Sequence, residues 1–289
     1  EVVHYRDEGD PARPDWVLVH GYSASTDTWV PWVRALEARY RLISIDLPGH
    51  GLTEAPAGFD PTIDAYVGVV RATLDALQLD KVNLVGSSLG GHVAWRFAAT
   101  HPDRLTSLVL VVAAGWRTPA IDDRPRPAVF TLFSTPVIGP LLRDIDTTAL
   151  VRRGLQNAVV RTSIVDDAMV TRYVEMSRGP GRRALLLRIM TNASNRPLAS
   201  AEALAPIRVP TLIFHGDRDN LVPVEHATLF NQAIVGSQLR IFPGVGHMPQ
   251  EEIPDVSAAE LDTFLRGVLE PAPPAPVPLP VQAPLPLRP

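Results

Sequence analysis

A single stretch within the first third of the chain constrains the fold more than any other part of the sequence. Residues 82–85, which read VNLV, are typical of a short buried strand, and apolar residues recur at helical spacing over 89–97. Between the two, residues 86–90 read GSSLG, which fits the pattern G-x-S-x-G. The two glycines allow a strand to turn sharply into a helix without Cβ clashes. Such a turn would expose the hydroxyl of Ser88 as a nucleophile at the end of a sheet. The alternative is an ordinary turn with a surface serine.

Charge and residue usage exclude several classes of function. The chain has 289 residues, which suits one large α/β domain with an insertion, and its 46% hydrophobic and 20% charged content is typical of soluble globular proteins. A net charge of −4 indicates no basic surface for nucleic acid or an anionic membrane. No apolar run reaches the roughly 18 residues of a membrane span. The absence of cysteine excludes disulfides, a thiol nucleophile and thiolate metal sites.

Short apolar runs alternate with amphipathic segments along most of the chain. This alternation is typical of β-α-β units and predicts an α/β protein with a mostly parallel sheet. The expected strands span 2–5 (an antiparallel edge strand), 16–19, 42–45, 82–85, 108–112, 211–214 and 239–242, and the expected helices span 28–40, 63–77, the segment after residue 88, 224–234 and 255–268. Ligands of such sheets bind at the carboxyl ends of the strands, and every candidate motif directly follows an expected strand.

The alternation breaks between residues 116 and 205, where no clear strand is visible and apolar residues keep helical spacing. We predict a helical cap at 116–205, inserted into a core made of 1–115 and 206–270. The insertion is rich in arginine, which favours a solvated helical face over a clamp for a charged substrate. Residues 271–289 contain nine prolines in nineteen positions, so we expect a disordered or polyproline-like tail.

Two residues far along the chain are the candidate partners of Ser88. A serine hydroxyl needs a base within hydrogen-bond reach, and that base needs a carboxylate that fixes its tautomer. His247 follows the last expected strand in a glycine-flanked loop and is the candidate base, although a loop histidine is the alternative. Asp219 follows the preceding strand and is the candidate acid. Asp217 competes with it, since one of the two could be catalytic while the other caps a turn.

An acyl-transfer site also needs N–H donors for a developing oxyanion. The backbone N–H of Leu89, at the helix start, is one candidate, and that of Tyr22, in the loop after residues 16–19, is the other. We interpret His20 in that loop as structural. The remaining histidines, at positions 4, 50, 92, 101, 215 and 226, are interpreted as structural or surface residues. A metal site at His215-x-Asp217-x-Asp219 is disfavoured because it lacks partners at recognisable spacing.

Together these residues resemble the α/β-hydrolase superfamily, in its serine esterase/lipase-like branch with a helical cap. The chain order Ser, Asp, His is that of the family. Five motifs carry the resemblance over about residues 3–269: LVHG at 18–21, DLPGHG at 46–51, GSSLGG at 86–91, GDRD at 216–219 with Pro223, and GHMP at 246–249 with Glu252 and Pro254. The resemblance implies eight strands, mostly parallel, under the cap, with Asp219 as the acid. By this resemblance, we expect that the first strand of the family's N-terminal hairpin is missing or has been clipped before Glu1.

Residue types within the family narrow the expected reaction. Dehalogenases and epoxide hydrolases of the family use an aspartate where this chain has Ser88. Its carbon–carbon bond hydrolases usually carry a glycine-rich oxyanion loop and a tryptophan after the histidine, where this chain has YSA at 22–24 and Met248. Carboxylic ester hydrolysis is therefore the favoured function. The alternatives are carbon–carbon bond hydrolysis of a vinylogous diketone and a hydrolase-fold protein that only binds a small ligand.

The resemblance implies no metal and no organic cofactor, and a small-molecule ester as the partner. Apolar cap residues would suit an apolar acyl or alcohol group, or they form the core of the cap instead; they are Val129, Phe130, Phe133, Leu141, Leu142, Leu185, Leu186 and Leu187. Oligomeric state is left open. A cytoplasmic location is favoured, although the chain starts at Glu1 and an upstream export signal could have been removed.

Overall fold

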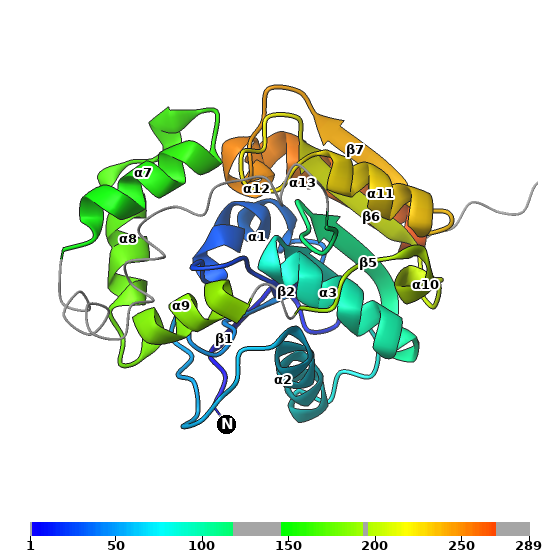
Figure 1. Ribbon diagram of the computed structural model, residues 1–289. Helices are drawn as coiled ribbons and strands as arrows, with labels where there is room; N and C mark the ends of the chain where they lie inside the picture. Colours follow the sequence, from blue (N-terminus) through cyan, green and yellow to red (C-terminus); the bar gives the residue numbers. More distant parts are fainter. Residues whose placement is uncertain (1, 118–145, 193–195, 270–289) are drawn as a thin grey trace, which may run out of the picture.

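A computed structural model describes residues 2–117, 146–192 and 196–269 (Figure 1). Its strands are β1 (Tyr5–Glu8), β2 (Asp15–Val19), β3 (Arg41–Ile45), β4 (Val82–Ser87), β5 (Leu105–Val111), β6 (Thr211–Gly216) and β7 (Gln238–Phe242). They form one sheet in the order β1-β3-β2-β4-β5-β6-β7. The pair β1–β3 is antiparallel, and all other neighbours are parallel. The described residues therefore form seven strands, where eight were implied, and β1 is an edge strand, with β7 at the opposite edge.

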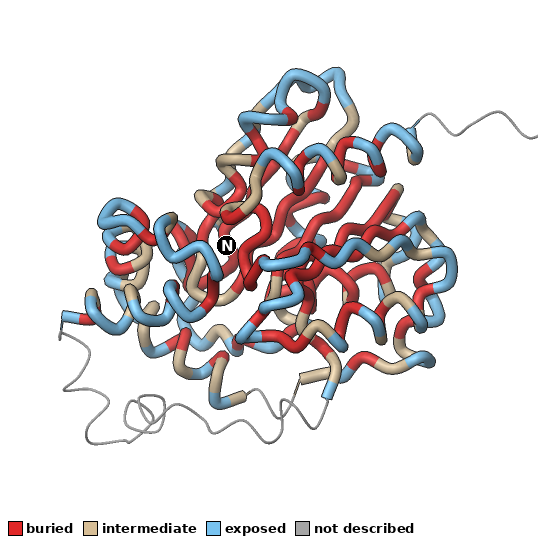
Figure 2. Tube along the Cα trace, turned by 90° about the horizontal axis from the view of Figure 1, so that it is seen from above, coloured by how far each residue is buried: buried red, intermediate tan, exposed pale blue. Residues whose placement is uncertain are grey.

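Alternation along the strands separates two hydrophobic cores, one on each face of the sheet. In β2, Trp16 and Leu18 point to one core while Val17 and Val19 point to the other, and all four are buried. This period of two is what a strand buried on both faces requires. Figure 2 shows the buried strands passing through the middle of the molecule under more exposed helices. The expected mostly parallel α/β architecture is thus confirmed.

Helices cover both faces of the sheet. One face packs against α1 (Val30–Leu36) and α13 (Pro254–Leu269); the other packs against α2 (Ile63–Ala76), α3 (Leu89–Thr100), α10 (Ala201–Leu204) and α11 (Glu225–Ala233). The helix expected at 28–40 is shorter than predicted. A 3₁₀ turn, η1 (Thr26–Trp29), precedes α1, and Pro31 lies in the first turn of α1, where its missing N–H costs no hydrogen bond.

The described part of the insertion is helical, as expected. It contains α7 (Thr148–Ala158), η3 (Thr162–Ile164), α8 (Asp167–Ser177) and α9 (Arg182–Thr191), which Figure 1 draws in green beside the sheet. A separate hydrophobic cluster joins α7 and α8 to Met248, while Leu186 and Ile189 of α9 join the core beneath. Arg178 and Arg188 pair with Glu175 and Asp60, which supports the interpretation of a solvated face.

Some predictions fall on residues outside the described ranges. These are the proline-rich tail and the cap residues Val129, Phe130, Phe133, Leu141 and Leu142. Among the residues that are described, Leu185 and Leu186 are buried, which supports a packing role for them. Within residues 2–117, 146–192 and 196–269, no helix has the length and apolar character needed to cross a bilayer.

Candidate active site

The turn between β4 and α3 holds Ser88 in a strained conformation. Its φ of 53° and ψ of −110° are rare for a residue with a side chain, and such backbone strain typically costs about 1–3 kcal/mol. A Cβ on Gly86 would lie 2.2 Å from the carbonyl oxygen of Gly90, and one on Gly90 would lie 2.2 Å from that of Val19. Only glycine allows these approaches. The Ser88 side chain makes no capping hydrogen bond to α3, so the hydroxyl is not committed to the helix.

Asp219 and His247 meet at the carboxyl ends of β6 and β7. The Nδ1 atom of His247 lies 2.7 Å from Oδ2 of Asp219, and both residues are buried. Oδ1 of Asp219 accepts the backbone N–H groups of Leu221 at 2.7 Å and Val222 at 2.9 Å. The carboxylate is therefore fixed by the turn behind it and can hold the imidazole in one tautomer, with Nδ1 protonated.

A second imidazole contacts the same carboxylate. His215 in β6 is fully buried, and its Nε2 lies 3.0 Å from the carbonyl oxygen of Val222 and 3.3 Å from Oδ2 of Asp219. Burial alone would raise the pKa of Asp219, but the imidazoles of His247 and His215 together lower it below its ordinary value. Sequence reasoning treated His215 as a structural residue and missed this contact; its only signal was its place four residues before Asp219.

Asp217 has a different partner. Its Oδ1 accepts the backbone N–H of Gly244 at 2.7 Å, in the turn that leads toward the histidine loop. Of the two acidic candidates, Asp219 therefore contacts His247, whereas Asp217 accepts a hydrogen bond within a turn. The catalytic role of Asp219 remains a prediction.

The loop after β2 lies against the nucleophile turn. A Cβ built on Gly21 would lie 3.2 Å from Cβ and 3.9 Å from Oγ of Ser88. Residues 21–24 form a turn in which Ala24 N–H donates to the carbonyl oxygen of Gly21 at 3.3 Å. The hydroxyl of Tyr22 donates to the carbonyl oxygen of Leu186 in α9 at 3.2 Å. The first predicted oxyanion donor, Tyr22 N–H, thus belongs to a loop beside Ser88.

The second predicted oxyanion donor is the N–H of Leu89. Leu89 is the first residue of α3, and N–H groups in the first turn of a helix have no acceptor within the helix. The positive end of the helix dipole also lies there, so this position favours a developing negative charge. Both predicted donors therefore lie in segments that adjoin Ser88.

The loop that carries His247 is attached to the insertion. The backbone N–H of His247 donates to the carbonyl oxygen of Ala158, at the end of α7, at 2.6 Å. Glu252, in α12 (Pro249–Glu252), is 1% exposed. Its Oε1 accepts Gly246 N–H at 2.8 Å, and its Oε2 accepts Val160 N–H at 2.8 Å. Glu252 entered the sequence analysis only through the resemblance.

The carboxylate of Asp219 is held by two backbone N–H groups and by the imidazoles of His247 and His215. Within residues 2–117, 146–192 and 196–269, no group of three or more histidine or acidic side chains is arranged to hold a metal ion. Nucleophilic acyl transfer requires a hydroxyl nucleophile, an imidazole–carboxylate pair and backbone N–H donors, and the chain has a candidate for each of these groups.

Comparison with known proteins places the chain in a family. The profile of the alpha/beta hydrolase fold family matches residues 17–254. A 2-hydroxy-6-oxo-2,4-heptadienoate hydrolase of Pseudomonas putida is 32% identical over 82% of this chain and 83% of its own length. The monoacylglycerol lipase ABHD6 of Bos taurus is 29% identical over 91% of this chain and 79% of its own.

Solved structures give the same result. The meta-cleavage product hydrolase CumD of Pseudomonas fluorescens, in a mutant form complexed with acetates, superposes with a TM-score of 0.77 at 25% identity, covering 91% of this chain and 94% of its own. Relatives thus divide between carbon–carbon bond hydrolases and lipases. With the profile match over most of its length, the chain is a serine hydrolase that belongs to the α/β-hydrolase family.

Proposed function

We propose that this protein is a carboxylic ester hydrolase that forms an acyl-enzyme intermediate on Ser88. The observation that supports this most is the hydrogen bond of 2.7 Å between Nδ1 of His247 and Oδ2 of Asp219, which lies among buried groups. Because the carboxylate holds the Nδ1 proton, Nε2 keeps its lone pair and is free to act as a base.

The proposed reaction proceeds in two halves. Ser88 attacks the ester carbonyl carbon while its proton passes to Nε2 of His247, and the N–H groups of Tyr22 and Leu89 stabilise the oxyanion. His247 then protonates the departing alcohol, which leaves the acyl group on Ser88. In the second half, His247 deprotonates a water that attacks the acyl-enzyme, the bond to the Ser88 oxygen breaks as His247 returns the proton to that oxygen, and the carboxylic acid is released. Asp219 stays ionised, in keeping with its lowered pKa, and no cofactor takes part.

An apolar ester is the proposed substrate class. The position after the histidine favours ester hydrolysis, since Met248 stands where the family's carbon–carbon bond hydrolases usually carry tryptophan. Met248 is 6% exposed and packs in the cluster that joins α7 to α8. Relatives at similar identity include a monoacylglycerol lipase, and a monoacylglycerol is an ester with an apolar acyl chain.

Carbon–carbon bond hydrolysis of a vinylogous diketone is the second candidate. It is favoured by the relative from Pseudomonas putida, which is named for a 2-hydroxy-6-oxo-dienoate and is 32% identical to this chain. Such a substrate also presents a carbonyl carbon for attack, and the same imidazole can supply the proton that the departing carbon requires. The two reactions therefore share the site and differ in the leaving group.

Turnover of two substrates by three proteins tests the proposal. Wild type, Ser88→Ala and Ser87→Ala are assayed on p-nitrophenyl butyrate and on 2-hydroxy-6-oxo-hepta-2,4-dienoate. We expect Ser88→Ala to lower kcat on the ester by about 10³-fold or more, because the nucleophile is lost while the fold remains. Ser87→Ala, the matched control in the same motif, should stay within about threefold of wild type.

Three other outcomes would contradict the proposal. A loss of less than about tenfold in Ser88→Ala would exclude Ser88 as the nucleophile. A kcat/KM on the dienoate that exceeds the ester value by about a hundredfold or more would assign carbon–carbon bond hydrolysis instead. If wild type turned over neither substrate, a ligand-binding protein of the same fold would become the better description.

A further inference from the structure

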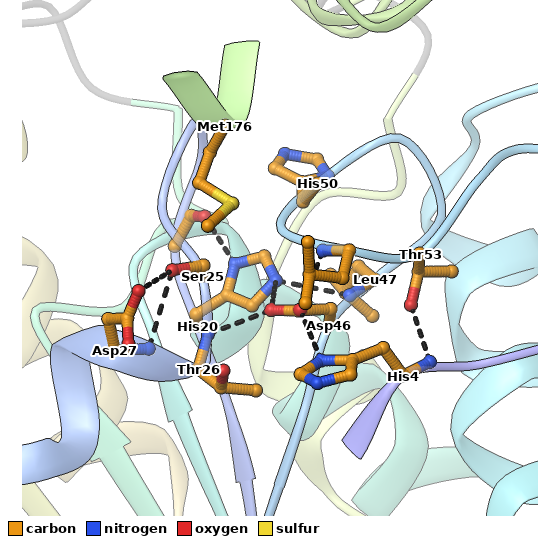
Figure 3. Close-up of polar contacts among 12 residues, drawn as sticks. His4, His20, Ser25, Thr26, Asp27, Asp46, Leu47, His50, Thr53 and Met176 are labelled. Atoms are coloured by element: carbon orange, nitrogen blue, oxygen red, sulfur yellow. Dashed lines mark hydrogen bonds and ion pairs between the residues drawn. The ribbon is translucent and has the colours of Figure 1, made fainter. Parts of the chain in front are cut away.

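A buried polar cluster lies beside the candidate site, and its centre is Asp46, directly after β3. Asp46 is 1% exposed. Its Oδ1 accepts Thr26 N–H at 2.8 Å, and its Oδ2 accepts Leu52 N–H at 2.9 Å. Nδ1 of His4 lies 2.7 Å from Oδ2. Figure 3 shows Asp46 between the imidazoles of His4 and His20. One carboxylate thus joins the N-terminal segment, the 46–51 loop and the loop after β2.

His20 links this cluster to the loop beside Ser88. It is fully buried, its Nδ1 lies 2.7 Å from the carbonyl oxygen of Gly21, and its Nε2 lies 3.1 Å from the backbone nitrogen of Leu47. An amide N–H can only donate and a carbonyl oxygen can only accept. The Nδ1 atom must therefore carry the proton, and Nε2 must be unprotonated. Burial also lowers the pKa of His20, against the opposing charge of Asp46, which favours this neutral form.

The hydrogen bond from His20 to the carbonyl oxygen of Gly21 also fixes the direction of the neighbouring N–H group, because both belong to one peptide unit. The carbonyl oxygen of Gly21 and the N–H of Tyr22 belong to the same planar, trans peptide unit, so they point in opposite directions. A hydrogen bond that holds the oxygen therefore also holds the N–H. Two donors hold this oxygen, the imidazole of His20 at 2.7 Å and the N–H of Ala24 at 3.3 Å. The Tyr22 N–H is the donor that the proposed reaction needs.

We propose that His20, anchored by Leu47 and by the cluster around Asp46, is a positioning residue that aims the Tyr22 N–H at the oxyanion formed on Ser88. The inference rests on the proposed function, because it requires that Ser88 is a nucleophile. His20 neither touches the substrate nor moves a proton in this scheme. Its imidazole orients a peptide plane, and Asp46 holds the far end of the same loop through Thr26 N–H.

Two substitutions at position 20 separate positioning from general packing. Asn carries an amide nitrogen where histidine carries Nδ1, so His20→Asn keeps a donor for the carbonyl oxygen of Gly21. His20→Leu fills a similar volume and has no donor. His92→Leu is the matched control, because His92 is a buried histidine in α3 whose Nε2 lies 2.8 Å from the carbonyl oxygen of Pro197. Thermal unfolding curves are measured for every variant, and all assays are done at a temperature at which each variant is folded.

The measurement is the second-order rate constant for labelling of Ser88 by a fluorophosphonate, whose phosphoryl oxygen needs the same donors as an oxyanion. We expect His20→Leu to slow labelling and to lower kcat on p-nitrophenyl butyrate by about tenfold or more, with KM changed less than threefold, since loss of a whole oxyanion donor costs about 10²–10³. His20→Asn should stay within about threefold of wild type, as should His92→Leu.

Other results would contradict either the positioning role of His20 or the proposed function, and they can be told apart. If wild type is labelled and folded His20→Leu is labelled at the same rate, the positioning role is wrong and the proposed function stands. If His20→Asn is as slow as His20→Leu, the donor to Gly21 is not what matters, and positioning through that bond is also wrong. If wild type is not labelled at Ser88, the proposed function fails and the inference fails with it.

Discussion

At the scale of single residues, the two acidic side chains of the 216–219 turn have different hydrogen-bond partners. Asp219 contacts two imidazoles and two backbone N–H groups, and Asp217 accepts one N–H from Gly244. The sequence offered both as the acid. Both residues follow the end of β6 at Gly216, and the structure separates them, because the imidazole of His247 contacts Asp219.

Neutralising each aspartate should therefore have unequal effects. We expect Asp219→Asn to lower kcat on the preferred substrate by about 10³-fold or more, since an amide at this place can favour the wrong tautomer of His247. Asp217→Asn, which keeps an oxygen acceptor for Gly244 N–H, should cost less than about tenfold. Steady-state kinetics of the two purified variants checks this, and the reverse order would reassign the acid to Asp217.

At the scale of elements, the loop that carries the candidate base is attached to the insertion as well as to the sheet. Glu252 accepts N–H groups from Gly246 on one side and from Val160 and Arg161 on the other, and the guanidinium of Arg161 donates to the carbonyl oxygen of Glu252. Ala158 at the end of α7 accepts the N–H of His247 itself. The position of His247, the candidate base, therefore depends on contacts with the insertion.

Removing the Glu252 carboxylate should loosen both segments at once. We expect Glu252→Ala to lower the free energy of unfolding by about 2 kcal/mol or more, because buried N–H groups lose their acceptor. The value of kcat should also fall, since the loop of His247 loses its support. Urea unfolding and ester turnover measure the two effects. The control is Glu175→Ala, which removes an exposed carboxylate in α8, and equal small losses in both variants would contradict the role of Glu252.

Much of the element order could be predicted from sequence because apolar side chains mark the buried positions of strands and helices. The continuous apolar run from Trp16 to Val19 and the glycines around Ser88 reflect local constraints that a sequence displays directly. Contacts between distant backbone groups leave no such record. The N–H of Val160 has no residue-specific signature, and its acceptor Glu252 lies 92 positions away. His215 lies only four residues before Asp219, but nothing in the sequence distinguishes a histidine that contacts this carboxylate from an ordinary strand histidine.

At the scale of the whole molecule, one largely buried carboxylate, that of Glu251, joins three regions. Glu251 of α12 accepts the hydroxyl of Thr28 in η1 at 2.6 Å, and the guanidinium of Arg172 in α8 donates to it at 3.3 Å. Burial raises the pKa of Glu251 to about 7, although Thr28 and Arg172 oppose the shift. The sheet layer, the histidine loop and the cap therefore meet at a group that titrates near neutral pH.

This shift predicts how stability depends on pH. Because the pKa of Glu251 is higher in the folded than in the unfolded chain, folding retains a proton, and the associated stability is lost as pH rises from about 4.5 through 7. We expect Glu251→Gln to remove this loss, so that its free energy of unfolding falls less over that range than that of wild type, by about 1–3 kcal/mol. Urea unfolding at several pH values measures the difference. Glu225→Gln, an exposed change in α11, should follow wild type, and a Glu251→Gln profile parallel to both would contradict the prediction.

The most direct test of the central claim is the covalent intermediate itself. A reaction of wild-type protein with p-nitrophenyl butyrate is quenched with acid in the first turnover, digested and analysed by peptide mass spectrometry. We predict a butyryl group on the hydroxyl of Ser88, and no acylated peptide from the Ser88→Ala protein under the same conditions. A butyryl group on another residue, or turnover by wild type with no acylation of Ser88 at any time point, would contradict the assignment of Ser88 as the nucleophile.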